Sequence, residues 1–193
     1  MNNELKALAY LLTYPDHVLI ENLEKIKSVL SHSTRLSKSE GETLKNFIQM
    51  LTSSPLTEIQ SLYVSTFENN RNRCLNLFEH LEGESKDRGA SMVHLIKLYG
   101  DYGLEFSSHE LPDFLPAVLE FLSGLNNTDT EIWLSSIAPL IAILDSELMV
   151  MKNPWSAVTG ALLTLAKQKR IQKQMSPEKK ADEAPIRFIS SAF

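Results

Sequence analysis

A short apolar segment that contains two prolines restricts the fold of this chain more than any other feature of its sequence. Residues 110–121 read E-L-P-D-F-L-P-A-V-L-E-F. Proline lacks a backbone N–H and disfavours helix at the residue before it, so a helix accepts proline only in its first turn. We therefore predict that a helix begins near Pro112 to Asp113. Its buried face should carry the apolar side chains at i, i+3, i+4 and i+7 spacing, which are Leu115, Val118, Leu119 and Leu122.

A second face of the same helix is predicted to be acidic. Asp113, Ala117, Glu120 and Gly124 are spaced so that two carboxylates lie within two turns of each other, with small side chains between them. Asp113 would also sit at the positive end of the helix dipole. Such an edge is suited to receive a positively charged helix or peptide.

Length and composition indicate one globular domain in a reducing compartment. A chain of 193 residues removes about 70% of its unfolded surface from water on folding. A content of 43% hydrophobic and 22% charged residues is ordinary for a folded protein. The single cysteine, Cys74, cannot form an internal disulfide, which favours the cytoplasm. The N-terminal residues carry no basic leader, so we expect a first amphipathic helix there and no secretion.

Charge is distributed unevenly along the chain. Residues 1–166 carry 12 basic and 21 acidic side chains, whereas residues 167–193 carry 7 basic and 3 acidic ones. An acidic body repels phosphate backbones, so we expect no nucleic-acid partner and consider a basic polypeptide the better one. The alternative is that the acidic surface only keeps the protein soluble.

Hydrophobic periodicity predicts an all-α fold, a single-domain bundle of about eight helices over residues 1–171, followed by a flexible tail over residues 172–193. No long stretch alternates in polarity. Ser37 and Glu40 form a capping-box pattern at the third helix, and Pro139 should kink or split the seventh. The predicted helices lie near residues 3–13, 16–31, 37–52, 55–69, 85–102, 112–124, 128–150 and 154–171.

Three features do not follow from a simple amphipathic pattern. The most hydrophobic stretch, residues 132–151, contains serines, a proline and two acids, so we expect a buried helix and no direct membrane insertion. Gly41 and Gly160 fall inside helical patterns. The tail is apolar again over residues 185–193. This segment either docks on the helical body or is apolar without a binding role.

Catalytic and metal-binding patterns are absent from the sequence. It has no phosphate-binding loop of the G-x-x-x-x-G-K-[ST] type and no G-x-G-x-x-G after a strand. The five histidines do not pair at i+3 or i+4, and His109, Glu110 and Asp113 are better explained by helix capping than by a metal. Glu110 and Asp113 as an acid–base pair lack an accompanying nucleophile or cofactor pattern. We therefore predict a protein that is not an enzyme and has no cofactor or metal of its own.

Two segments carry a resemblance to a known family. The first is F-E-H-L-E-G-E-S-K-D-R-G over residues 78–89, and the second is E-L-P-D followed by L-E-F within residues 110–121. With L-L-T-Y-P-D over residues 11–16 and the Tyr63 and Phe67 pair, the chain resembles the NarJ-type nitrate reductase assembly chaperones of the wider TorD-like molybdoenzyme chaperone family. The likeness spans most of residues 5–165 and is weak in the tail.

The resemblance implies an all-helical cytoplasmic chaperone with the TorD-like fold that is not part of the finished enzyme. Members of this family bind the N-terminal segment of the catalytic (alpha) subunit and hold that subunit until the molybdenum cofactor is inserted, which delays its docking on the membrane-anchoring subunit. Many relatives have histidine where this chain has Phe114, which favours apolar contact there. The residues that carry over as part of the family's peptide site are Pro112 and Asp113, with Glu110 and Glu120 beside them. We add Phe114, Leu115 and Pro116 of the same segment to the predicted peptide site.

We expect the client peptide to bind in a groove between helices, where its lysine or arginine side chains would pair with Asp113 or Glu120. Ordinary core packing is the alternative for each candidate residue of the groove wall, namely Tyr63, Phe67, Leu115 and Phe114. A polar run between helices either braces a loop and caps a helix or contacts the client or its cofactor. Its members are Glu79, His80, Glu84, Asp87 and Arg88.

Several alternatives stay open at the level of sequence. The client is either the nitrate reductase or another molybdoenzyme of the DMSO or TMAO reductase type, and the protein is either a chaperone or a helical adaptor that remains in the mature complex. A role as carrier of the molybdenum cofactor is disfavoured by the acidic body and the lack of a phosphate cradle. Molybdenum cofactor biosynthesis proteins are further candidate partners, and a monomer and a helix-swapped dimer are both compatible with the sequence.

Overall fold

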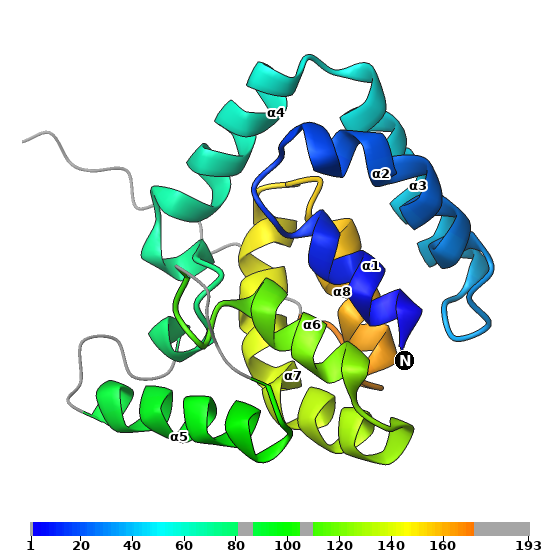
Figure 1. Cartoon of the computed structure of the whole chain (residues 1–193). Coiled ribbons are helices and arrows are strands. Elements are labelled where there is room, and N and C mark those ends of the chain that lie inside the picture. Colours follow the sequence, from blue (N-terminus) through cyan, green and yellow to red (C-terminus); the bar gives the residue numbers. More distant parts are fainter. Residues whose placement is uncertain (1, 81–86, 105–109, 172–193) are drawn as a thin grey trace, which may run out of the picture.

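Helices make up most of the structure, as the sequence predicts. The computed structural model describes residues 2–80, 87–104 and 110–171 (Figure 1). The described residues form no strand and only one isolated bridge, between Asn76 and Phe114, so the all-α prediction is confirmed. A π-helical turn covers Val64–Glu68, and 3-10 turns cover Arg71–Arg73 and Leu77–His80. The α-helices are α1 (Asn3–Leu11), α2 (His17–Ser31), α3 (Lys38–Ser53), α4 (Leu56–Tyr63), α5 (Asp87–Asp101), α6 (Leu115–Gly124), α7 (Asn127–Val150) and α8 (Ser156–Leu165).

α1 lies among the other helices and packs against several of them (Figure 1). Its most extensive contact is with α6, and it also packs against α2 and α8. α7 and α8 lie behind α1 and α6 in this view. Fully buried side chains of α1, such as Leu5 and Leu8, place the core between these helices. Ring contacts join the end of α5 to α6, because Tyr99 of α5 and Tyr102, just after it, lie at centroid distances of 4.7 and 5.5 Å from Phe121.

Helix ends follow the capping patterns of the sequence. The Asp16 carboxylate accepts a hydrogen bond from the N–H of Leu19 at 2.7 Å, which starts α2. Ser37 and Glu40 make the predicted capping box at α3. α7 is one helix through Pro139, so of the two expected outcomes, a kink or a split, the split does not occur. Pro139 is exposed, and water can therefore reach the carbonyl group that it leaves without a helical partner.

α6 begins later than predicted. It starts at Leu115, not near Pro112 to Asp113, and Pro116 lies in its first turn. The Leu115 N–H donates to the Leu75 carbonyl at 2.7 Å, so the chain just before α6 is paired with a distant segment. That pairing keeps the preceding residues from turning into helix, and local periodicity does not reveal it.

Two other boundaries differ from the predicted ones. The predicted helix over residues 55–69 becomes π-helical from Val64. α8 ends at Leu165, not at residue 171, and Lys167 then takes a left-handed backbone conformation with φ 58°. Glu84 and the predicted tail, residues 172–193, lie outside the described residues.

An aromatic cluster joins the end of α1 to the rest of the core. The ring centroid of Trp155 lies 5.7 Å from that of Tyr63 and 5.4 Å from that of Phe67. The last carbonyl groups of a helix have no partner within it. Here the indole N–H of Trp155 donates to the Leu11 carbonyl at 2.9 Å, and the Tyr63 hydroxyl donates to the Leu12 carbonyl at 2.9 Å. These aromatic side chains therefore satisfy acceptors at the end of α1 as well as filling the core.

We predict that Trp155→Phe lowers the free energy of unfolding by about 2 to 4 kcal/mol, because it removes the donor to the Leu11 carbonyl and opens a cavity. Urea unfolding followed by far-UV circular dichroism measures this loss. Trp133→Phe is the matched control, since Trp133 is only partly buried, and it should cost less than about 1 kcal/mol. Equal losses in the two variants would contradict the role assigned to Trp155.

Candidate functional site

The two segments that stand out in the sequence meet in space. The Leu77 N–H donates to the Asp113 carbonyl at 3.0 Å. The Asp113 carboxylate accepts two further hydrogen bonds, from the Asn76 side-chain amide at 3.1 Å and from the Phe78 N–H at 2.9 Å. Asp113 therefore fastens residues 76–78 to the start of α6.

The prediction that Asp113 lies on an exposed acidic edge is wrong. Its side chain is 0% exposed, because the residue precedes α6 and is enclosed by the paired segment. A buried carboxylate is costly unless hydrogen-bond donors satisfy it, and Asn76 and Phe78 supply them. The neighbouring Pro112 is buried as well, and its carbonyl accepts a hydrogen bond from the Tyr99 hydroxyl at 2.7 Å. Asp113 thus positions the surrounding chain and offers no surface to a guest.

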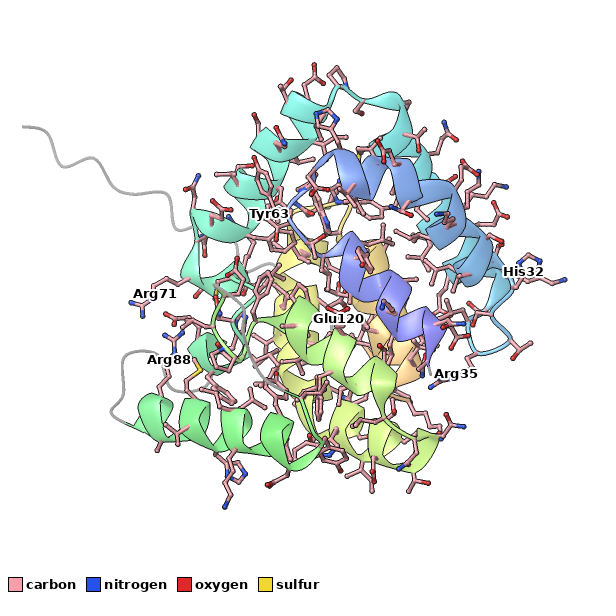
Figure 2. All side chains as sticks on the ribbon, in the orientation of Figure 1. His32, Arg35, Tyr63, Arg71, Arg88 and Glu120 are labelled. Carbon is pink, nitrogen blue, oxygen red and sulfur yellow. The ribbon has the colours of Figure 1, made fainter. Side chains whose placement is uncertain are left out.

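The polar run of the first segment forms a brace. Glu79 pairs with Arg71, at 2.5 Å between Oε1 and Nη2, and with Arg88 of α5. Figure 2 shows both arginines on the same side of the molecule. The hydrogen bond from Arg71, together with the charge of Arg88, lowers the pKa of Glu79. His80 Nε2 lies 2.9 Å from the Cys74 carbonyl oxygen. These contacts favour the bracing interpretation for Glu79, His80 and Arg88.

Two further residues lie next to those of the brace, namely Asp87, which precedes Arg88 in sequence, and Cys74, whose carbonyl group His80 contacts. Asp87 is the first residue of α5, at the helix start where the sequence placed it. Burial raises the pKa of the Cys74 thiol, so the reactive thiolate form is disfavoured at neutral pH. The Cys74 sulfur lies 3.7 Å from the Asn76 carbonyl oxygen, to which the thiol donates weakly.

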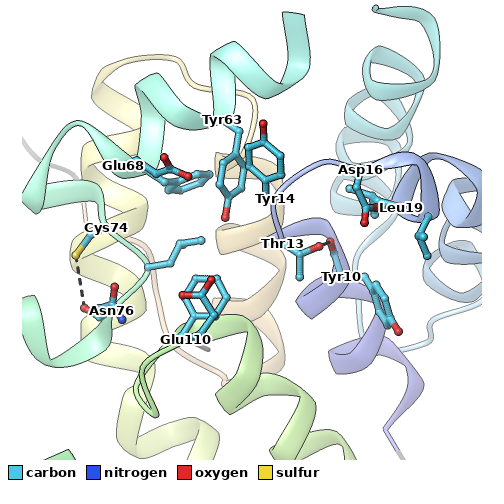
Figure 3. A pocket seen from close by; sticks show the side chains of 14 residues that line it. Tyr10, Thr13, Tyr14, Asp16, Leu19, Tyr63, Glu68, Cys74, Asn76 and Glu110 are labelled. Carbon is cyan, nitrogen blue, oxygen red and sulfur yellow. Dashed lines mark hydrogen bonds between the residues drawn. The ribbon is translucent and has the colours of Figure 1, made fainter. Parts of the chain in front are cut away.

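Two adjoining hollows form a groove beside α1, which we call the α1 groove. Figure 3 shows the larger of the two. The larger, of about 750 Å³, lies between the end of α1, the start of α2 and the end of α4. The smaller, of about 210 Å³, lies between α1 and α6. Both are lined by Tyr10, Thr13, Glu110 and Phe114. The larger is further lined by Tyr14, Asp16, Val18, Leu19, Tyr63, Phe67, Glu68, Cys74, Leu75 and Asn76, and the smaller by Lys6, Ala9, Pro116, Ala117 and Glu120.

Aromatic side chains form the floor and part of the rim of the larger hollow. Tyr63 and Phe67 line it although each is only 3% exposed, so both also belong to the core. Tyr10, Tyr14 and Val18 are exposed by 40%, 46% and 57%. These three were not predicted as site residues. The signal that could have marked two of them is the pair of tyrosines at the predicted end of the first helix, of which Tyr10 lies away from the leucine face of α1.

The predicted wall residues on the α6 side divide into two groups. Phe114 lines both hollows, and Pro116 lines the smaller one. Leu115 lines neither and is 0% exposed, because it lies in the first turn of α6 on the face that packs into the core. Its assignment to the groove wall is therefore corrected to core packing.

The groove has a negative rim. Its charged lining residues are Asp16, Glu68, Glu110, Glu120 and Lys6. Glu120, labelled in Figure 2, has a side chain 61% exposed and pairs with Lys6 at 3.7 Å. Burial raises the pKa of Tyr63, and the charges of Glu68 and Glu110 raise it further, so both carboxylates act on the aromatic floor. The groove therefore combines apolar surface with an excess of negative charge.

Two further features of the described residues concern a membrane span and a metal site. α7 is long and apolar enough to cross a membrane by length and composition, but half of its apolar window is buried inside the body, where it packs against α6 and α8. Within the described ranges, no three side chains of His, Cys, Asp or Glu are arranged so that they could hold a metal ion.

Comparisons with known proteins agree on one family. A family model described as nitrate reductase delta subunit matches residues 33–157. The nitrate reductase molybdenum cofactor assembly chaperone NarJ of Escherichia coli (strain K12) is 36% identical over 181 residues, which cover 94% of this chain and 76% of that protein. The probable assembly chaperone NarW of the same strain is 34% identical over 182 residues, 92% and 76% of the two chains. A probable NarJ of Bacillus subtilis (strain 168) is 29% identical over 118 residues, 61% and 63% of the two chains.

We predict that Asp113→Asn lowers the free energy of unfolding by about 1 to 3 kcal/mol, because the amide replaces one of the two accepting oxygens with an NH2 group and leaves the donor that points at it unsatisfied. Guanidinium chloride unfolding of the purified chain measures the change. Glu120→Gln should stay within about 0.5 kcal/mol, since Glu120 is exposed. A destabilisation of equal size in Glu120→Gln would show that burial does not separate these two acids.

Proposed function

This chain belongs to the nitrate reductase delta subunit family, with the NarJ-type assembly chaperones, and on that premise we propose that it binds the N-terminal segment of the catalytic subunit of a respiratory nitrate reductase. It acts in the cytoplasm, holds the immature subunit while the molybdenum cofactor is inserted, and is not an enzyme. Its relatives are named as assembly chaperones, which supports the chaperone role.

The α1 groove is the observation that carries this proposal. A peptide that folds into an amphipathic helix binds in such a groove by laying its apolar face against apolar walls. Tyr10, Tyr14 and Val18 are exposed and available for that contact. Glu110 and Glu120 lie on the rim, where they match lysine or arginine side chains of a basic leader peptide.

The two kinds of contact contribute differently. Apolar burial stabilises the complex by about 25 cal/mol for each Å² removed from water, so the aromatic side chains supply most of the affinity. An exposed ion pair contributes only about 0 to 1 kcal/mol, and the pair between Lys6 and Glu120 is of this kind. A guest cation can therefore replace Lys6 beside Glu120 at small cost. The rim acids then set the register of the peptide and speed its association.

Calorimetry with a synthetic peptide of the first residues of the catalytic subunit tests the electrostatic part. The double variant Glu110→Gln and Glu120→Gln should raise the Kd by about 3- to 20-fold, because two favourable charge contacts are lost. Glu58→Gln is the matched control, since Glu58 is an exposed acid of α4 that lines neither hollow, and its Kd should equal that of the unchanged chain. An unchanged Kd in the double variant would remove the rim acids from the site.

The apolar part is tested by Tyr14→Ala. Tyr14 is 46% exposed and stacks edge-on against Tyr63 at a centroid distance of 5.5 Å. Its loss should raise the Kd at least about tenfold, as expected for an aromatic side chain that a bound partner covers. Ile132→Ala removes an exposed apolar side chain of α7 outside the groove and serves as the control. If both variants bind the peptide as the unchanged chain does, the peptide does not occupy the α1 groove.

A further inference from the structure

A second candidate site surrounds Gly160 of α8, which does not line the α1 groove. It sits inside α8 without a positive φ that would require glycine. Glycine in the middle of a helix costs about 1 kcal/mol relative to alanine. Here the backbone is approached closely, because a Cβ atom at Gly160 would lie 1.4 Å from Nη2 and 2.2 Å from Cζ of Arg170. The guanidinium group of Arg170 therefore rests on the bare backbone of α8.

The chain reaches this position by a reversal after α8. The Lys167 N–H donates to the Thr164 carbonyl at 3.0 Å, and the Gln168 N–H donates to the Leu163 carbonyl at 2.8 Å. These are the two hydrogen bonds of a Schellman motif, whose left-handed residue is usually glycine. Lys167 takes that conformation with φ 58°, at a cost of about 1 to 2 kcal/mol. The turn directs the following residues back along α8.

Three groups surround the guanidinium group of Arg170. Its Nη2 donates to the Ser156 carbonyl at 2.5 Å, its Nη1 lies 3.2 Å from the Met149 sulfur, and its Nε lies 3.4 Å from Oδ2 of Asp145. Asp145 is completely buried, and its Oδ1 accepts a hydrogen bond from the Thr159 hydroxyl at 2.6 Å. Its Oδ2 has no hydrogen-bond partner among the described residues. The unsatisfied oxygen thus faces the cation.

We propose that Asp145, Gly160 and the Ser156 carbonyl form a guanidinium-binding site, which Arg170 of the same chain occupies. The site selects a guanidinium over an ammonium group, because a flat group fits against the bare backbone and its fixed N–H fork meets acceptors on several sides. Burial raises the pKa of Asp145, and the Thr159 hydrogen bond and the Arg170 charge oppose that rise. The contacts of Arg170 offset the glycine inside α8 and the left-handed Lys167.

A double-mutant cycle on the full chain tests the occupant. In the otherwise unchanged chain, Gly160→Ala should lower the melting temperature by about 3 °C or more, because the new methyl group displaces the guanidinium group. In the Arg170→Ala background the same change should raise the melting temperature by about 2 to 4 °C, because alanine is the better helix former. A fall of the same size in both backgrounds overturns the proposal.

Chemical rescue tests the ligand class. Millimolar methylguanidinium should raise the melting temperature of Arg170→Ala, whereas methylammonium at the same concentration should not. The control is the double variant Gly160→Ala and Arg170→Ala, in which the methyl group fills the site, and methylguanidinium should leave its melting temperature unchanged. Arg170→Lys should melt below the unchanged chain, since an ammonium group cannot reproduce the fork. Equal shifts with both cations, or in both variants, overturn the assignment of a guanidinium site.

Discussion

The groove depends on the buried carboxylate of Asp113. This carboxylate accepts hydrogen bonds from the Asn76 side-chain amide and the Phe78 N–H. The backbone carbonyl of Asp113 accepts a further hydrogen bond from the Leu77 N–H, so two segments that are distant in sequence are held side by side. A carboxylate without partners in this place would be strongly unfavourable, which makes the pairing close to obligatory once the chain is compact. The same pairing fixes Phe114, the residue that lines both hollows.

The acidic residues around the groove have two different roles. Asp113 and Glu79 are satisfied by their own chain, Glu79 through Arg71 and Arg88, and both stabilise the walls of the site. The acids that a guest can reach are on the rim, and the Glu120 side chain there is 61% exposed. The first segment that carries the family resemblance therefore contributes mainly architecture, through Phe78, Glu79 and Arg88. The second segment also supplies part of the groove surface, through Glu110, Phe114 and Glu120.

Local patterns explain what could be read from sequence. Periodicity and capping rules gave the all-α fold and the starts of α2 and α3, because these signals lie within a few residues. The prediction put Asp113 on an exposed face because its partners lie far away in sequence, and an isolated bridge produces no periodic pattern of apolar residues. Helical spacing correctly placed Leu115 on the buried face of α6, and its additional assignment to the groove wall was wrong because spacing does not show what that face meets. Tyr10 was missed for the same reason.

The floor of the groove is buried and packed into the core whereas its rim is exposed, and this difference bears on recognition. Tyr63 is fixed by its hydrogen bond to the Leu12 carbonyl and by its contacts with Trp155, so a guest meets a surface that the core has already ordered. Binding then costs conformational entropy mainly in exposed side chains such as Tyr10 and Tyr14. Substitutions in the floor disturb folding before they alter recognition. Preference for one leader peptide over another should therefore be set on the rim, where side chains can change without loss of the fold.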